Sequence, residues 1–304
     1  MKTLLIIGGT GFLGKSIIDY TSRNSLKKYN ITKIILLSRK RKKIISQNKD
    51  IKISYIHKNI RNIKKLPRTD YVIYAANSKK FSENIESIKN FTKVISNLPK
   101  DKKILFTSSG VVYCYFNDRN KKKEINEVKI KNTLKLKNYK KKYAEAKIVS
   151  EQEIKKLAKR GCNTSIARLF TYAGKRILKN KKFAISNIIS QASNKNKKSI
   201  KVYSDKVFRS YMYADDLVEW LLNILNSSNR KCPIYNVGSN EAVSIYEFAK
   251  MVGSIFNKKV ILENKTANKD IDFYVPSITK AKKLLNLKIK FKLEKIISIL
   301  LNNN

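Results

Sequence analysis

The feature that most constrains this chain is a run of glycines near its first residue. A short apolar segment, Leu4–Ile7, precedes three glycines spaced three residues apart, and an amphipathic segment follows them. This order predicts a buried strand, a tight turn and a helix. The N–H groups and the partial positive charge at the start of such a helix favour a phosphate group. The pattern therefore predicts nucleotide binding; the alternative is a tight strand–helix turn without a ligand.

Each glycine has its own task in this prediction. Gly8 allows a sharp turn, Gly11 lets the backbone approach a pyrophosphate, and Gly14 lets the helix pack closely on the strand. The residues expected to contact a cofactor here are Gly8, Thr10, Gly11, Phe12, Leu13 and Gly14.

Apolar segments that predict strands alternate with amphipathic segments that predict helices. Strands are expected at residues 4–7, 34–37, 51–56, 70–76, 103–107 and 163–169, and helices from the glycine turn to 27–28, over 85–98 and over 139–159. Such alternation indicates an α/β fold with a Rossmann-like, doubly wound parallel sheet, whose ligands bind at the carboxyl ends of the strands. Residues 115–138 are polar, rich in lysine and without periodicity, which predicts a surface loop.

The end of the second strand bears on the choice of cofactor, because it meets the adenosine ribose in such a fold. An acid there would bind the 2′-hydroxyl of NAD, but the sequence has Ser38 and Arg39. Arg39 could pair with the 2′-phosphate of NADP, so NADP(H) is favoured and NAD(H) remains possible. Further cofactor contacts are expected after the next two strands, at Asn59, Ile60, Ala75 and Ala76.

Three polar residues form a candidate catalytic set. Ser109 follows the fifth strand, and Tyr143 and Lys147 share one face of the helix expected over 139–159. Reduction of a ketone needs a proton for the developing alkoxide, and a tyrosine can supply it. An adjacent ammonium stabilises the tyrosinate and lowers the pKa of the phenol, while a serine can orient the substrate oxygen.

At this point the chain resembles the extended short-chain dehydrogenases/reductases, in their NAD-dependent epimerase/dehydratase group. The segments that carry the resemblance are Gly-Gly-Thr-Gly-Phe-Leu-Gly (8–14), Tyr-Ala-Ala (74–76), Thr-Ser-Ser-Gly-Val-Val-Tyr (107–113), Tyr-Ala-Glu-Ala-Lys (143–147), Arg-Ser-Tyr-Met-Tyr-Ala-Asp-Asp-Leu (209–217) and Tyr-Asn-Val-Gly-Ser (235–239). They keep the family's order over nearly the whole chain. By family position the catalytic serine is Ser109 rather than Ser108.

Four segments in the second half, 167–174, 183–189, 211–216 and 242–245, resemble one subgroup. It contains nucleotide-sugar 4-ketoreductases of the abequose synthase and dTDP-4-dehydro-6-deoxyglucose reductase type. The resemblance implies reduction of a nucleotide-linked 4-keto-6-deoxy sugar in deoxyhexose biosynthesis for a surface polysaccharide such as a lipopolysaccharide O-antigen. Related 4-epimerases share most of these residues, so an NAD-dependent nucleotide-sugar 4-epimerase is the main alternative.

The resemblance also implies how the chain is divided and assembled. Residues 1–170 would form the NAD(P)-binding domain, to which 208–235 return, and 171–304 would form mainly a smaller substrate-binding lobe. A homodimer is implied as well. Thr107 and Phe170 would contact the cofactor, and the substrate would be bound by Ser109, Thr171, Asn187, Val202 and Arg209. Asp216 is expected to cap a helix rather than to act in catalysis.

The sequence departs from the family's pattern at a few positions. Tyr74 stands where a histidine is common, Cys114 where a glycine is usual, and Lys175 where a proline is frequent. None of these removes a catalytic group, but the first two could change the wall of the site.

The composition bears on whether the protein binds nucleic acid, a metal ion or a membrane. The formal net charge is +45, yet the basic residues are spread along the chain with abundant Lys, Asn, Ile, Tyr and Phe, as an AT-rich genome would produce. We therefore expect no specific nucleic-acid partner, although a non-catalytic polyanion- or RNA-binding protein on this fold is an alternative of a different class. One histidine and three cysteines without metal spacing predict no metal site and reduced thiols. No apolar run approaches the ~20 residues of a membrane helix, so we expect a cytoplasmic protein without a membrane partner.

Overall fold

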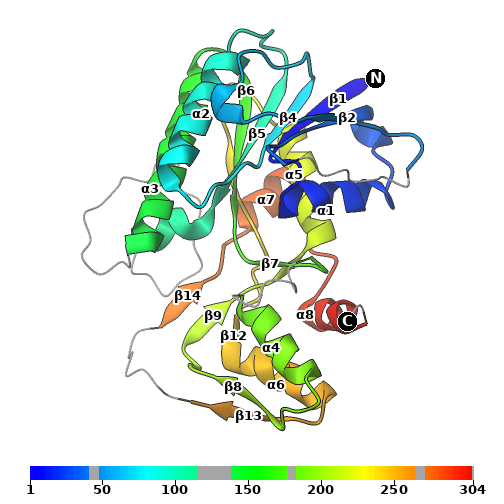
Figure 1. Ribbon diagram of the computed structural model, residues 1–304, viewed down its shortest axis with the longest axis vertical. Helices are drawn as coiled ribbons and strands as arrows, with labels where there is room; N and C mark the ends of the chain where they lie inside the picture. The colour runs from blue at the N-terminus through cyan, green and yellow to red at the C-terminus, as the bar shows by residue number, and fades with distance from the viewer. Residues whose placement is uncertain (41–47, 116–137, 177–182, 264–270, 303–304) are drawn as a thin grey trace.

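The computed structural model describes residues 1–40, 48–115, 138–176, 183–263 and 271–302. Its largest unit is a seven-stranded sheet with every neighbouring pair parallel, in the order β11-β6-β5-β4-β1-β2-β3 (Figure 1). The strands are β1 (Lys2–Ile7), β2 (Ile31–Leu37), β3 (Lys52–Ile56), β4 (Tyr71–Tyr74), β5 (Lys103–Ser109), β6 (Asn163–Leu169) and β11 (Ile234–Val237). The strand order runs outward from β1 in both directions, so the predicted doubly wound, Rossmann-like α/β fold is confirmed.

Alternate side chains of each central strand enter two different cores. In β1, Leu4 and Ile6 join the core that covers one face, together with α1 (Phe12–Thr21), α5 (Ala214–Asn226) and α7 (Thr279–Leu285). Leu5 and Ile7 join the core on the other face, with α2 (Phe81–Ile95) and α3 (Asn138–Lys159). Because both faces of the sheet are covered, the central strands are apolar throughout, which explains the continuous apolar runs in the sequence.

A smaller unit lies beyond one end of the large sheet (Figure 1). Its core is shared by α4 (Ala184–Ser193), α6 (Ile245–Ile255) and α8 (Leu293–Leu301). Short strands complete it: β8 (Ser199–Val202) pairs with β13 (Lys259–Leu262), β9 (Val207–Arg209) pairs with β12 (Val243–Ser244) and β14 (Asp272–Tyr274), and β7 (Tyr172–Ala173) pairs with β10 (Met212–Tyr213). Between the segments of this unit, α5 and β11 return to the large sheet.

Two details of the helices differ from the sequence predictions. The first helix ends at Thr21, not near Lys27. The Asn48 side chain donates to the carbonyl of Thr21 (2.8 Å), and a separate 3₁₀ turn occupies Lys27–Tyr29. Asp216 does not cap α5. Its carboxylate instead accepts the backbone N–H groups of Lys290 (3.0 Å) and Phe291 (3.1 Å), and burial raises its pKa to about 6. This carboxylate therefore ties α5 to the segment that leads into α8.

The sequence also makes predictions about a surface loop, the cysteines and membrane-spanning helices. The predicted loop at 115–138 lies almost entirely outside the described residues, as does the side chain of Cys114. Cys162 and Cys232 are buried free thiols. Among the described residues, no helix is both long and apolar enough to cross a bilayer.

The turn after β1 shows why glycine is required at two of its positions. Gly8 has φ +89°, and a Cβ there would lie 2.7 Å from the backbone nitrogen of Ala76. A Cβ on Gly14 would lie 2.2 Å from the carbonyl oxygen of Gly9. Gly14 therefore lets α1 pack against the turn itself, rather than against the strand as the sequence analysis expected.

These contacts predict different effects for two alanine substitutions. Gly14→Ala should lower the free energy of unfolding by about 2 kcal/mol, because its methyl group has to displace backbone. Gly11→Ala is the matched control, since a Cβ there meets one atom, the Gly8 carbonyl oxygen, at 3.1 Å and φ is −73°. Urea unfolding of both variants measures the difference. Equal losses of stability would contradict this account of the turn.

Candidate active site

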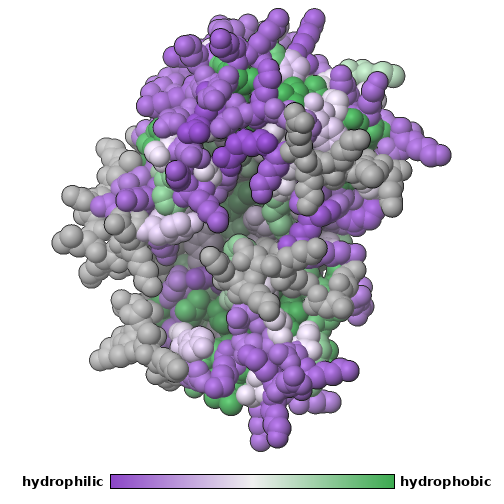
Figure 2. Space-filling view, viewed as in Figure 1, coloured by the Kyte–Doolittle hydropathy of each residue, from purple (hydrophilic) through white to green (hydrophobic). Residues whose placement is uncertain are grey.

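A cavity of about 1220 Å³ opens at the carboxyl ends of the central strands. Gly8 after β1, Ala75 after β4, Ser109 at the end of β5 and Phe170 after β6 line it from the large unit. Residues of the smaller unit, such as Arg209, line it from the other side. Figure 2 shows the hollow between the two units, within a surface that is largely hydrophilic. The cavity thus lies where a parallel α/β sheet is expected to bind its ligand.

Most of the residues predicted to bind a cofactor or substrate line this cavity: Gly8, Thr10, Gly11, Phe12, Leu13, Ser38, Arg39, Asn59, Ile60, Ala75, Ala76, Thr107, Ser109, Tyr143, Lys147, Phe170, Thr171 and Arg209. Three predicted residues do not. Gly14 packs against Gly9, Val202 is buried in the core of the smaller unit, and Asn187 lies exposed on α4, where it accepts a hydrogen bond from Gln191 (2.7 Å). Because the side chains of β8 alternate, Val202 points into that core instead of into the cavity.

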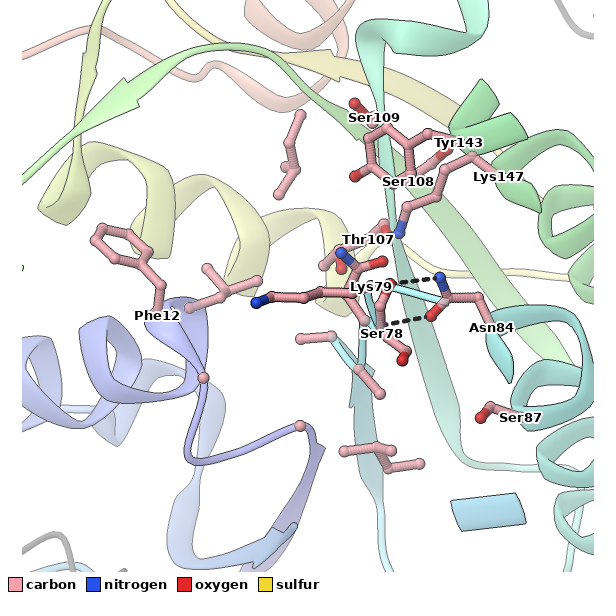
Figure 3. A pocket seen from close by; sticks show the side chains of 18 of the residues that line it. Phe12, Ser78, Lys79, Asn84, Ser87, Thr107, Ser108, Ser109, Tyr143 and Lys147 are labelled. Atoms are coloured by element: carbon pink, nitrogen blue, oxygen red, sulfur yellow. Dashed lines mark hydrogen bonds between the residues drawn. The ribbon is translucent and has the colours of Figure 1, made fainter. Parts of the chain in front are cut away.

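Ser109, Tyr143 and Lys147 come together at one side of the cavity (Figure 3). The ammonium of Lys147 donates to the carbonyl oxygen of Thr107 (3.0 Å) and lies 5.9 Å from the centre of the Tyr143 ring. The neighbouring Ser108 is engaged elsewhere, because its hydroxyl donates to Glu151 (2.6 Å). Ser109 therefore presents the serine hydroxyl that interacts with Tyr143.

The two titratable members of this set are both shifted by burial. Burial lowers the pKa of Lys147 to about 8, and the carboxylate of Glu151 opposes part of that effect. Burial also raises the pKa of Tyr143, and the Ser109 hydroxyl offsets this only partly. The sequence predicts that Lys147 lowers the pKa of Tyr143; the net direction is the opposite, because loss of water disfavours the phenolate. A phenol with a raised pKa stays protonated at neutral pH and can donate its proton.

The glycine turn offers donors that fit a pyrophosphate. α1 begins at Phe12 with Gly11 as its N-cap, and no described side chain hydrogen-bonds to the free N–H groups of its first turn. Thr10 and Ser38 are joined by a hydrogen bond between their hydroxyls at the edge of this turn. Together with the space above Gly11, these groups fit the diphosphate of a dinucleotide.

The ribose end of the cavity carries a carboxylate that the sequence analysis did not find there. No acid follows β2 directly, as the sequence shows, but Glu83 at the start of α2 reaches Arg39, with 3.6 Å between Nη1 and Oε2. Arg61 lies 3.9 Å from the same carboxylate, and Ser78 donates to it (2.6 Å). The hydrogen bond from Ser78 and the nearby cations lower the pKa of Glu83. The contact between Glu83 and Arg39 joins residues far apart in sequence, so no local pattern predicts it. The one hint in the sequence is that Glu83 follows the carboxyl end of a predicted strand.

Arg209 and Phe170 lie where the two units meet. The Arg209 guanidinium donates to the carboxylate of Asp272 (2.8 Å) and to the carbonyl of Phe208 (2.7 Å), and its carbon lies 5.7 Å from the centre of the Tyr274 ring. The ring of Phe170 lies 4.7 Å from that of Tyr274. These contacts hold the Arg209 guanidinium, paired with Asp272, at the cavity wall of the smaller unit.

A sequence model of the NAD dependent epimerase/dehydratase family matches residues 4–238. The chain belongs to the NAD-dependent epimerase/dehydratase family. No curated protein sequence matches it significantly.

Solved structures share the fold of this epimerase/dehydratase-family protein over almost its whole length. A UDP-glucose 4-epimerase from Thermotoga maritima, solved with UDP-glucose, is 17% identical, with a TM-score of 0.74 over 99% of this chain and 98% of that one. The UDP-Glc/GlcNAc 4-epimerase from Campylobacter jejuni is 16% identical, with a TM-score of 0.74 over 100% and 99%. A dTDP-glucose 4,6-dehydratase from Bacillus anthracis, in complex with NAD, is 14% identical, with a TM-score of 0.72 over 99% and 96%. At these identities the likeness shows the fold.

The segment after β4 adds residues that the sequence analysis missed in this family member. The Lys79 side chain extends across the cavity towards Phe12 (Figure 3). Ser78 and Asn84 fix the segment through two hydrogen bonds, from the Ser78 N–H to Oδ1 (2.7 Å) and from Nδ2 to the Ser78 carbonyl (3.0 Å). Tyr74 does not line the cavity, because its ring packs in the core against Phe91 (5.0 Å between centroids). The wall change that the sequence analysis allowed for Tyr74 is therefore absent.

The lowered pKa of Lys147 predicts the pH dependence of turnover by this family member. Lys147 is protonated below its pKa of about 8 and loses its charge above it, while Tyr143 with a raised pKa keeps its proton. Turnover that uses both groups should fall as the pH rises through about 8. Measurement of kcat from pH 6 to 10 tests this, and a flat profile across that range would contradict it.

Proposed function

We propose that this chain reduces the 4-keto group of a nucleotide-linked 4-keto-6-deoxy sugar with NAD(P)H. The observation that carries the proposal is that Ser109, Tyr143 and Lys147 share one cavity with the open glycine turn between β1 and α1. When bound there, a reduced nicotinamide supplies the hydride for the sugar C4.

Three side chains bind the substrate oxygen and the cofactor and supply the proton. Tyr143 donates its phenolic proton to the oxygen that forms at C4, and Ser109 orients that oxygen by hydrogen bonding. Lys147 hydrogen-bonds to the nicotinamide ribose and stabilises the tyrosinate that the proton transfer leaves behind. The raised pKa of Tyr143 supports the reductive direction, because the phenol is protonated when the carbonyl binds.

NADP(H) is the proposed cofactor. Four cationic side chains line the adenosine end of the cavity, against one carboxylate, that of Glu83; they are Arg39, Lys40, Lys58 and Arg61. A 2′-phosphate suits such an excess of positive charge, and a guanidinium can bind it through two hydrogen bonds.

The substrate proposal rests on the second unit. Arg209 supplies the positive charge that a diphosphate needs, and Thr171 lines the same wall. The Thermotoga maritima neighbour was solved with UDP-glucose, which supports a nucleotide sugar as the substrate class. We further propose that 1–170 with 208–235 serve the cofactor, that the rest serves mainly the substrate, that the enzyme is a cytoplasmic homodimer, and that its product enters a surface polysaccharide.

An NAD-dependent 4-epimerase is the second candidate. It is favoured by Glu83, whose carboxylate lies at the ribose end and can accept a hydrogen bond from the 2′-hydroxyl of NAD. Two of the structural neighbours described above are 4-epimerases. The candidates differ in net cofactor consumption, because an epimerase returns the hydride that it takes.

The proposed proton donor gives a direct prediction. Tyr143→Phe should reduce kcat by roughly 10²–10⁴-fold, because it removes the general acid, while cofactor affinity stays within about twofold. Tyr139→Phe is the matched control: this tyrosine lies one turn earlier on α3, is 68% exposed and does not line the cavity. Steady-state kinetics and cofactor titration measure both, and an unchanged kcat in Tyr143→Phe would end the assignment.

The proposed preference for NADP(H) gives a second prediction, which concerns Arg39. Arg39→Ala should raise the KM for NADPH about tenfold, since a charge-assisted hydrogen bond is lost, and leave the KM for NADH nearly unchanged. Arg68→Ala, at an exposed arginine outside the cavity, is the control. If both cofactors respond equally to Arg39→Ala, this arginine does not select the 2′-phosphate.

A further inference from the structure

A buried ion pair lies directly behind the candidate active site. Arg168 on β6 donates to both carboxylate oxygens of Glu151 on α3, from Nε (2.9 Å) and from Nη2 (2.6 Å). The two side chains are 0% and 4% exposed. Apolar residues in place of such a pair are often as stable or more so, so stability alone does not account for it.

Glu151 connects this pair to the catalytic set. It lies one helical turn after Lys147 on α3, so the two side chains share a face of the helix. Its Oε1 also accepts the hydroxyl of Ser108 (2.6 Å), the residue next to Ser109 on β5. The carboxylate therefore holds the end of the strand that presents Ser109.

Arg168 extends the network to the other wall of the site. Its Nη1 donates to the hydroxyl of Tyr113 (2.9 Å), which in turn donates to Oδ1 of Asn236 on β11 (2.9 Å). The Tyr113 ring stacks with that of Phe170, with 6.0 Å between centroids, and Phe170 lines the cavity. One ion pair thus links β5, β6, β11 and α3 behind the site.

The groups around Lys147 leave Glu151 as the carboxylate that acts on it. On α3 these groups are Tyr143 and Glu151, and β5 contributes the carbonyl of Thr107 and the ring of Phe106, which lies 5.1 Å from the ammonium. From β6, Arg168 is bound to the same Glu151. The charged residues of α2, the helix packed on α3, lie elsewhere: Glu83 and Glu86 face Arg61, and Lys89 and Lys93 are exposed.

We propose that Glu151 is a positioning residue of this enzyme: its carboxylate keeps the buried Lys147 ammonium charged and fixes the strand end that carries Ser109, while Arg168 holds the carboxylate in place. The inference rests on the proposed roles of Ser109, Tyr143 and Lys147. It adds to them the group that keeps the lysine positively charged in a cavity wall where burial favours its neutral form.

The test uses the double variant Glu151→Gln with Arg168→Met in the full chain. Glu151→Gln alone would leave a buried guanidinium without its counterion, which is strongly destabilising. Circular dichroism checks folding, and the pH dependence of Lys147 acylation, read by mass spectrometry of the peptide that contains it, measures its protonation without any turnover. Glu153→Gln is the matched control, because Glu153 lies on the same helix and pairs with the exposed Lys156. Glu151→Asp keeps the carboxylate and reports the role of its charge.

In the double variant the midpoint of Lys147 labelling should fall by about one pH unit, and kcat at pH 8 should fall about fivefold with the same displacement of its pH profile. Glu151→Asp and Glu153→Gln should keep the wild-type midpoint. An unchanged midpoint in the folded double variant, or an equal shift in Glu153→Gln, would overturn the proposal. If the double variant does not fold, Glu151→Met with Arg168→Met replaces it, because apolar side chains often substitute for a buried ion pair without loss of stability; a lowered midpoint would support the proposal and a wild-type midpoint would overturn it. A wild-type enzyme without turnover, whose labelling midpoint still responds to the double variant, would refute the proposed reaction and leave the role of Glu151 standing.

Discussion

The parallel pairing of β1, β4, β5 and β6 is the constraint on which the site depends. In register, these strands bring four carboxyl ends to one edge of the sheet, and the residues at or just after those ends supply the glycine turn, the small Ala75–Ala76 step, Ser109 and Phe170. The apolar side chains of each strand fix this register from both faces, because a one-residue slip would exchange the two cores. The site is thus held by the same burial that holds the fold.

Burial also sets the chemistry of the site. Removing Tyr143 and Lys147 from water favours the neutral form of each, which makes the phenol a proton donor and brings the ammonium close to losing its charge. The glycine turn has the opposite character, since it lines the cavity and leads into the first turn of α1, where no cap side chain among the described residues binds the polar N–H groups. One end of the cavity therefore attracts phosphate, and the other can transfer a proton in an environment of low dielectric constant.

The sequence predicted those features of the fold and the site that depend on residues close to one another in the chain. The spacing of Gly8 and Gly11, the apolar strands and the shared helix face of Tyr143 and Lys147 follow from neighbours in sequence, and the structure places them together. Val202 and Asn187 were assigned to the substrate by resemblance alone. The alternation of β8 turns Val202 into the core of the smaller unit, and Asn187 accepts a hydrogen bond from Gln191 and does not line the cavity. Two contacts join distant segments of the chain: Glu83 with Arg39, and Glu151 with Arg168. The periodicity of the sequence therefore does not predict them. The direction in which the pKa of Tyr143 shifts depends on how deeply the phenol is buried. The four-residue spacing of Tyr143 and Lys147 gives no information about that depth.

The central claim is tested most directly by consumption of the reduced cofactor. Purified protein would be incubated with NADPH or NADH and with dTDP- or CDP-linked 4-keto-6-deoxyglucose, and the products identified by NMR. The account predicts that NADPH disappears in proportion to a new 4-hydroxy sugar. Unchanged 4-keto sugar with no loss of reduced cofactor, together with C4 epimerisation of UDP-glucose offered in a parallel incubation and release of bound NAD when the protein is denatured, would contradict it and assign the same residues to an epimerase.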